Sequence, residues 1–166
     1  TAFAGGTNFA FLAAAKNKLQ LLQKDKAAYS FELPAGINVQ DIVFDATQNQ
    51  FWILSDKEIY SFSPANNALT KQITADQMTA FAVNPGRNQL VIGTKNGFFT
   101  YDLKAKKKSE VNQKLPWTEI TTVQADQDKV WFGTTMGAFS MDAAGEFSYY
   151  YGDRWLPGEH VKDLII

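Results

Sequence analysis

The sequence predicts an all-β fold, a β-propeller of four four-stranded blades together with the first strand of a fifth. Two observations predict it: a motif recurs about every 40 residues along the 166-residue chain, and short apolar runs are separated by Gly, Pro, Asn, Asp or Ser. Four short strands in each repeat of this length are typical of propeller blades, which bury their faces against one another around a central axis.

The repeat is visible as four segments that align without gaps at successive shifts of 40, 39 and 40 residues. The last two segments share the pattern Gly-Thr-x-x-Gly, at residues 93–97 and 133–137. Four segments in one register are hard to obtain by chance. The aligned segments are Phe11–Leu19, Phe51–Ile59, Leu90–Phe98 and Val130–Ala138. They place the predicted blades at residues 1–38, 39–77, 78–117 and 118–160, with a further strand at 161–166.

The third copy shows how each blade is predicted. Its apolar runs indicate strands at Thr79–Val83, Gln89–Gly93 and Phe98–Leu103, separated by turns that contain Asn, Pro and Gly. A lysine-rich turn at Lys104–Lys108 is expected to lead into the fourth strand near Ser109–Gln113. No stretch of the chain has the long 3.6-residue periodicity of a substantial helix.

The apolar segment Val161–Ile166 reads as the first strand of a fifth blade. An unpaired strand of this kind would be an exposed edge and an aggregation risk. We therefore expect the chain to be part of a larger propeller of about six to eight blades, completed by further blades from the same or another chain. A closed four-bladed unit, with the last strand pairing back onto the first blade, is the alternative.

The fourth copy resembles the two-component-regulator type of propeller repeat. It carries that family's Trp-x-Gly-Thr pattern in Val130–Thr134, its Leu-Pro pair at Leu156-Pro157 and its following Val161 strand. It departs from the pattern at Ala138, where Leu is usual, and at Met141, where Tyr is usual. The third copy lacks the tryptophan, the second lacks both glycines, and the first keeps only the apolar pattern.

This resemblance implies a ligand-sensing or interaction propeller, often located outside the cytoplasm and often linked to carbohydrate systems. The family shares no single set of catalytic residues that could be carried over. The Gly-Thr-x-x-Gly pattern is expected to serve folding, with the first glycine allowing a tight turn and the threonine packing on the sheet. A phosphate-binding role is not expected, because the strand–loop–helix context of a phosphate loop is missing.

Composition narrows the classes of function. The chain has 16 basic and 17 acidic residues, no cysteine and a single histidine. The absence of cysteine excludes disulfide scaffolds, Cys-ligated metals and thiol catalysis. Balanced charge gives no reason to expect a nucleic-acid partner. No apolar run approaches the ~20 residues of a membrane span, and no metal site or cofactor is predicted.

A ligand-binding rim is expected where the loops that enter strand one, and those that join strands two and three, lie together; this is an analogy with other propellers. Residues 147–155 hold five aromatic side chains beside an arginine. Aromatic faces stack on sugar rings, and charged groups bind hydroxyls, so the segment suits a saccharide or a similar polar ligand. The predicted ligand-binding residues are Trp117, Glu119, Tyr151, Asp153, Arg154, Trp155 and His160.

A simpler interpretation leaves the tyrosines in the core. Phe147, Tyr149 and Tyr151 alternate along a predicted fourth strand, and one face of that strand would pack on the next blade. This explains the tyrosines without a ligand, but it explains Arg154 and Trp155 less well.

The favoured function is therefore a non-catalytic binding or sensor propeller, and two alternatives stay open. In the first, the chain is part of a carbohydrate lyase or hydrolase in which His160, with Glu159 or Tyr151, acts as acid and base. In the second, it is an interaction scaffold whose open edges pair with a partner chain by strand addition.

Overall fold

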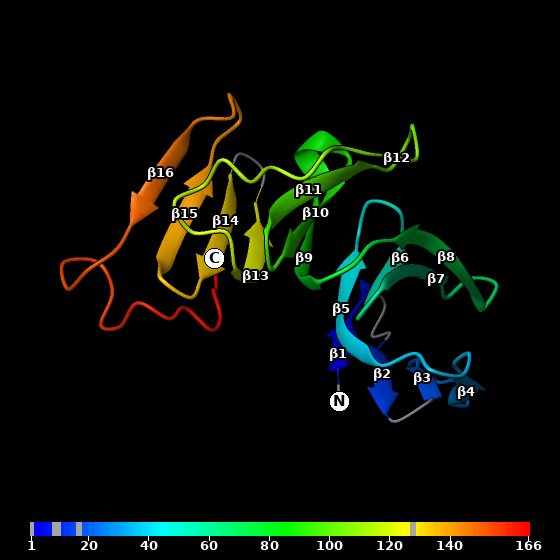
Figure 1. Ribbon diagram of the computed structural model, residues 1–166. Helices are drawn as coiled ribbons and strands as arrows, with labels where there is room; N and C mark the ends of the chain where they lie inside the picture. Colours follow the sequence, from blue (N-terminus) through cyan, green and yellow to red (C-terminus); the bar gives the residue numbers. More distant parts are fainter. Residues whose placement is uncertain (1, 8–10, 16–17, 127–128) are drawn as a thin grey trace. The chain divides into compact units, whose positions relative to one another are not determined.

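The computed structural model describes residues 2–7, 11–15, 18–126 and 129–166, and it is built from four antiparallel sheets of four strands each (Figure 1). In every sheet the strands follow in chain order, so that each pairs with its sequence neighbours. The predicted all-β class and the four four-stranded blades are therefore confirmed. The chain divides into two compact units, Thr1–Asp76 and Gln77–Ile166, with two sheets in each.

The first unit holds two of the sheets. One consists of β1 (Ala2–Gly5), β2 (Phe11–Ala15), β3 (Lys18–Leu22) and β4 (Tyr29–Glu32). The other consists of β5 (Val39–Asp45), β6 (Gln50–Ser55), β7 (Glu58–Ser63) and β8 (Ala68–Thr74). Their facing sides share one core, in which Leu12, Leu19, Phe51, Ile53 and Phe62 are fully buried.

The second unit repeats this arrangement. One sheet consists of β9 (Met78–Asn84), β10 (Gln89–Thr94), β11 (Gly97–Asp102) and β12 (Lys107–Lys108), with the short 3-10 turn η2 (Pro85–Arg87) between β9 and β10. The other consists of β13 (Ile120–Ala125), β14 (Val130–Thr134), β15 (Gly137–Met141) and β16 (Phe147–Tyr150). Their shared core includes Val91, Phe98, Ile120, Phe132 and Phe139.

The fourth strand of the third blade differs from the expectation. It forms at Lys107–Lys108 rather than near Ser109–Gln113. The turn closes early, because the Asp102 carboxylate accepts hydrogen bonds from the backbone N–H groups of Lys104 and Ala105. The Ser109 hydroxyl then accepts from the Thr100 N–H, which replaces a ladder bond. Only an isolated bridge between Phe98 and Asn112 follows.

In three blades a Ser or Thr hydroxyl at the end of the second strand is hydrogen-bonded across the hairpin to the first residue of the third strand. In the fourth blade the Thr134 hydroxyl donates to the Gly137 carbonyl at 2.8 Å and accepts from the Met136 N–H at 3.1 Å. Thr94 does the same in the third blade, with the Gly97 carbonyl and the Asn96 N–H. In the second blade the Ser55 hydroxyl donates to the Glu58 carbonyl in the same way, but it accepts from the Glu58 N–H, one residue further along. The threonine of the repeat therefore fixes the hairpin through its hydroxyl.

The first glycine of the Gly-Thr-x-x-Gly pattern makes room for a neighbouring strand instead of shaping a turn. A Cβ atom on Gly93 would lie 2.5 Å from Cγ2 of Ile120, the first residue of β13. A Cβ atom on Gly133 would lie 2.7 Å from Cγ1 of Val161. The expected role in a tight turn is thus replaced by clearance between a sheet and the strand that covers it.

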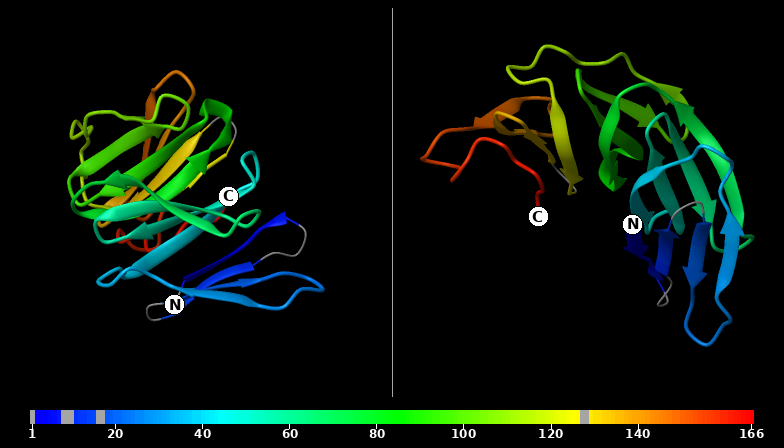
Figure 2. Two further views of the ribbon diagram at one scale, coloured as in Figure 1. Left: turned by 90° about the vertical axis from the view of Figure 1, so that its right-hand side faces the viewer. Right: turned by 60° about the horizontal axis from the view of Figure 1, so that its bottom comes forward.

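Residues Val161–Ile166 do not pair into a ladder with any strand in the described part of the chain. Val161 nevertheless occupies the place against Gly133 that Ile120 occupies against Gly93. Its N–H donates to the Thr134 carbonyl at 3.0 Å, and its carbonyl accepts from the Thr121 hydroxyl. Figure 2 shows this red tail running back from β16 toward the yellow strands of the same unit. No helix among the described residues is long and apolar enough to cross a membrane.

Candidate functional site

An aromatic pocket of about 450 Å³ lies in the second unit, lined by Pro116, Trp117, Tyr149 and Tyr151. The Trp117 ring meets Tyr151 edge to face, with 5.4 Å between centroids, and meets Tyr149 in the same manner at 6.2 Å. Trp117 is half-buried, whereas Tyr149 and Tyr151 are 38% and 60% exposed. The pocket therefore presents aromatic surface to solvent.

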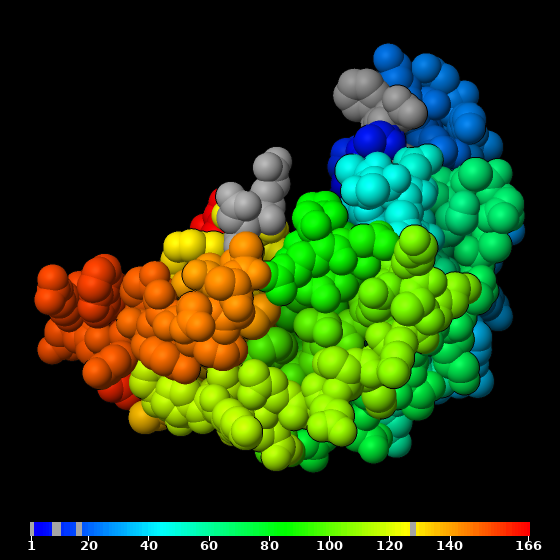
Figure 3. Space-filling model, turned by 90° about the horizontal axis from the view of Figure 1, so that it is seen from above, coloured from blue at the N-terminus to red at the C-terminus, as the bar shows by residue number. Residues whose placement is uncertain are grey.

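Local chain geometry explains why these rings meet. Trp117 belongs to the connection before β13, which lies beside the orange β15–β16 hairpin in Figure 3. The ring of Trp117 covers Gly137 so closely that a Cβ atom there would lie 3.0 Å from the indole Cζ3. Gly137 also has a φ of +139°, a conformation that favours glycine. The second glycine of the repeat pattern, Gly137, thus leaves the space that the Trp117 ring occupies.

A second aromatic group lies on the opposite face of the same sheet. Side chains alternate along β16, so Tyr150 points away from Tyr149. Tyr150 contacts Trp131 and Trp155, each with 5.4 Å between ring centroids. The Arg154 guanidinium lies over the Trp155 ring, 5.4 Å from its centroid.

The predicted ligand-binding residues are thus divided by the sheet. The structure brings Trp117 and Tyr151 together, and it places Arg154 and Trp155 with Tyr150 on the other face. The other predicted ligand-binding residues, and the acid–base candidate Glu159, are exposed, and in the part of the chain that the structure describes their side chains make no hydrogen bond or ion pair with a neighbour. These residues are Glu119, Asp153, Glu159 and His160. The suggested acid–base pair of Glu159 and His160 therefore lacks a connecting hydrogen bond.

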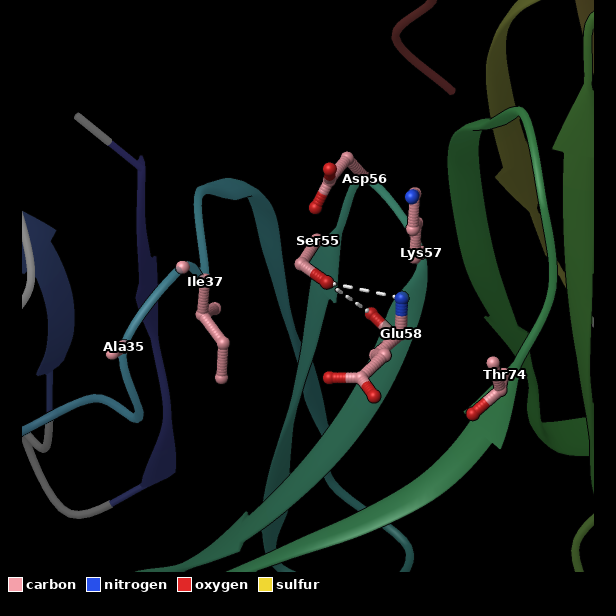
Figure 4. Close-up of a pocket in the computed structure, with 8 residues that line it drawn as sticks. Ala35, Ile37, Ser55, Asp56, Lys57, Glu58 and Thr74 are labelled. Atoms are coloured by element: carbon pink, nitrogen blue, oxygen red, sulfur yellow. Dashed lines mark hydrogen bonds between the residues drawn. The ribbon is translucent and has the colours of Figure 1, made fainter.

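A smaller polar pocket of about 270 Å³ lies in the first unit. It is formed by the loop before β5 and the tip of the β6–β7 hairpin, two stretches expected on the ligand-binding rim, although none of their residues was a predicted ligand-binding residue. Figure 4 shows Ile37, from the loop before β5, facing Glu58 across this pocket, while Asp56 and Lys57 project from the tip of the β6–β7 hairpin. The lining residues are Ala35, Gly36, Ile37, Ser55, Asp56, Lys57, Glu58 and Thr74.

Two neighbouring side chains hold the Glu58 carboxylate of this pocket. Its oxygens accept hydrogen bonds from the Tyr60 hydroxyl and, at 3.0 Å, from the Lys71 ammonium. These two bonds, the one from Tyr60 first, hold the pKa of Glu58 below its usual value. Burial, reinforced by the bond to Glu58, raises the pKa of Tyr60 to about 12. Tyr60 is therefore a permanent donor to an ionised carboxylate at neutral pH.

The repeat shows how this pocket differs from the equivalent places in the third and fourth blades. Glu58 aligns with Gly97 and Gly137, where a Cβ atom would lie 2.0 and 2.8 Å from a backbone oxygen. The second blade thus replaces an obligatory glycine by a charged residue. Both carboxylate oxygens already have partners within the protein, which gives Glu58 a structural role. Among the described residues, no group of three or more His, Cys, Asp or Glu side chains gathers closely enough to hold a metal ion.

Comparisons with known proteins agree on the fold. No family model matches the chain, and no curated protein matches it. Among solved structures, it resembles U3-55K, with a TM-score of 0.76 and 10% identity over 92% of this chain and 51% of that one. It also resembles the extracellular domain of a putative one-component system from B. thetaiotaomicron, with a TM-score of 0.69 and 15% identity over 89% and 21% of the two chains.

A third similar structure, from the mitotic checkpoint complex, has a TM-score of 0.69 and 12% identity, and the match covers 86% of this chain and 46% of that one. The chain therefore spans about half, or less, of the chains that it resembles. At these identities the likeness establishes the architecture alone. The four meander sheets and these similar structures together show that the chain has a β-propeller fold.

Proposed function

We propose that this chain is a non-catalytic propeller that binds a saccharide in the aromatic pocket of its second unit. The observation that supports the proposal is the gathering of Trp117, Tyr149 and Tyr151 around one exposed cavity. The cavity of about 450 Å³ lies within the range of about 300–1,000 Å³ that is typical of small-molecule sites. The polar pocket at Glu58, with about 270 Å³, lies below that range.

The lining suits a sugar ring for two reasons. Exposed aromatic faces stack on the apolar C–H faces of a pyranose, and the phenol groups of Tyr149 and Tyr151 can donate to and accept from its hydroxyls. Glu119 and Asp153 each lie two residues from a ring of the pocket and are exposed carboxylates, so they are our candidates to accept hydrogen bonds from the ligand.

A sensor role outside the cytoplasm is part of the same proposal. One of the similar structures is the extracellular domain of a putative one-component system, and the fourth copy resembles the two-component-regulator repeat. An extracellular propeller that binds a saccharide and passes the signal on would need no catalytic residues of its own.

An array of immobilised neutral and uronate-containing oligosaccharides tests the proposal. The unaltered chain should bind a subset of the array, and calorimetry with a soluble member of that subset should then give a Kd. Trp117→Ala should weaken binding by about tenfold or more, since a lost stacking partner costs about 1 kcal/mol beyond its buried area. Tyr151→Ala, at a 60% exposed position, should do so without disturbing the fold.

Trp155→Ala is the matched control, because Trp155 is a similarly exposed aromatic residue, at 55%, on the other face of the sheet. Its affinity should equal that of the unaltered chain. The proposal fails if no oligosaccharide binds, or if Trp155→Ala abolishes binding that Trp117→Ala and Tyr151→Ala leave intact.

A further inference from the structure

Two charged side chains at the polar pocket of the first unit have no partner within the described part of the chain. They are Asp56 and Lys57, which are both exposed at the tip of the β6–β7 hairpin and both line the pocket. Figure 4 shows the Asp56 carboxylate on the side of the tip that faces Ile37, and the Lys57 ammonium on the other side. One negative and one positive group are therefore available to a ligand.

The third charge of the pocket is already compensated. The Glu58 carboxylate accepts from the Tyr60 hydroxyl through one oxygen and from the Lys71 ammonium through the other. The charges that remain free at the pocket, those of Asp56 and Lys57, therefore sum to zero. A ligand with a single charge would leave one of them without a partner, whereas a zwitterion would form a charge-assisted hydrogen bond with each.

The equivalent place in the third blade is bridged by side chains. Asn96 aligns with Lys57, and its amide donates to the side-chain oxygen of Gln77 at 2.8 Å. Gln77 comes directly before β9, as Asn38 comes directly before β5. Among the described residues, no such bond joins Asn38 to Lys57. The second blade thus keeps a cavity where the third blade has a hydrogen bond between the loop and the hairpin tip.

Size and lining limit the ligand further. A cavity of about 270 Å³ has the volume of about nine water molecules, at about 30 Å³ for each, so it admits a ligand of up to about nine non-hydrogen atoms. Ile37 faces Glu58 across the pocket and packs against the core of the first unit (Figure 4). It supplies an apolar wall to which a small aliphatic group could pack.

We propose that this pocket binds a small aliphatic α-amino acid as its zwitterion. Asp56 accepts hydrogen bonds from the ligand's ammonium group, Lys57 donates to its carboxylate, and Ile37 contacts its side chain. An α-amino acid carries its two charged groups on one carbon, which suits partners on two consecutive residues of a hairpin tip. The site lies in the first unit and the aromatic pocket in the second, so this proposal does not depend on saccharide binding.

Titration of L-valine into the ¹⁵N-labelled protein is the first test. The backbone amide signals of residues 36–37 and 55–58 should shift and saturate, while the indole signal of Trp117 should stay in place. Isobutylamine keeps the amine of valine without its carboxylate, and isovalerate keeps the carboxylate without the amine. Each should bind about fivefold or more weakly than L-valine, because each leaves one charged group of the pocket without a partner.

Two variants assign the charges, and both should keep the fold because the positions are exposed. Asp56→Asn and Lys57→Gln should each weaken L-valine binding about fivefold or more. The preference for L-valine over isobutylamine should vanish in Lys57→Gln, and the preference over isovalerate should vanish in Asp56→Asn. Lys95→Gln is the matched control, because Lys95 is an exposed lysine at the tip of the equivalent hairpin in the third blade; it should leave the affinity unchanged.

Three results would overturn the proposal. The first is L-valine producing no saturable shift at these amides, or shifts only elsewhere. The second is either analogue with a single charge binding the unaltered protein as well as L-valine does. The third is an unchanged affinity for L-valine in both Asp56→Asn and Lys57→Gln.

Discussion

Replacing Gly93 by alanine tests whether the repeat glycine serves as clearance for the neighbouring strand. The new Cβ would lie 2.5 Å from Cγ2 and 2.9 Å from Cβ of Ile120, and 3.1 Å from Cγ2 of Val123. Ile120 is 0% exposed, so its side chain cannot avoid the new Cβ by turning into solvent. Overpacking of this kind costs about 1–3 kcal/mol, whereas the lower entropy of the unfolded alanine chain returns only about 0.4–1 kcal/mol. We expect a net loss of about 1–2 kcal/mol.

Urea unfolding followed by circular dichroism measures this loss. Gly158→Ala is the control, because a Cβ atom there would meet nothing within 4 Å; it should be neutral or slightly stabilising. Ile120→Ala alone should cost about 2–5 kcal/mol, and the double variant should cost less than the sum of the two by about 0.5–3 kcal/mol. A neutral Gly93→Ala, or strictly additive costs in the double variant, would refute the clearance argument.

Three further predictions concern the two hairpins that border the pockets. Tyr60→Phe should cost about 1 kcal/mol at pH 7 by loss of the bond to Glu58. The pKa of Tyr60 rises from 10.0 to about 12, so its contribution is complete below pH 10, is lost as the pH rises through 12, and should be missing in Tyr60→Phe; unfolding at pH 7 and 11 checks this. The pKa of Glu58 is lowered from 4.5, so its contribution is present above that pH and lost on further acidification; acid titration should show a flatter loss of stability for Glu58→Gln. Thr134→Ala removes a hydroxyl that is 0% exposed and bonds twice to the β14–β15 hairpin, and it should cost about 1–3 kcal/mol in thermal unfolding; an unchanged Tm would contradict the role of this hydroxyl in the hairpin.

The strands could be predicted from sequence because local signals agree with the packing. In the third blade, the predicted Gln89–Gly93 becomes β10 (Gln89–Thr94), and Phe98–Leu103 becomes β11 (Gly97–Asp102). Alternating apolar residues and glycine-rich turns decide these positions locally. The fourth strand was misplaced because a single side chain, Asp102, closes the turn early. Such a bond depends on one rotamer and leaves no periodic pattern.

The candidate site was predictable only in part. The proximity of Trp117 to Tyr151 follows from the connectivity of the blade, since the start of β13 and the end of β16 lie at the same end of the sheet. The separation of Trp155 from Trp117 does not, because it depends on the alternation of β16 and on the path of the chain after Tyr150. The polar pocket lies on loops that were expected on the rim, but its chemistry was not predictable. The departure from glycine at Glu58 is visible in the repeat, whereas the bonds of Glu58 to Tyr60 and Lys71 require the sheet register.

The four indole N–H signals of the ¹⁵N-labelled protein test the central claim most directly, since the chain has four tryptophans. Single Trp→Phe variants assign the signals, and a soluble oligosaccharide from the binding subset is then titrated into the sample. The account predicts that the Trp117 signal shifts and saturates, while the signals of Trp52 and Trp155 stay in place. Shifts confined to Trp131 and Trp155, or no shift at all, would contradict a saccharide site in the aromatic pocket.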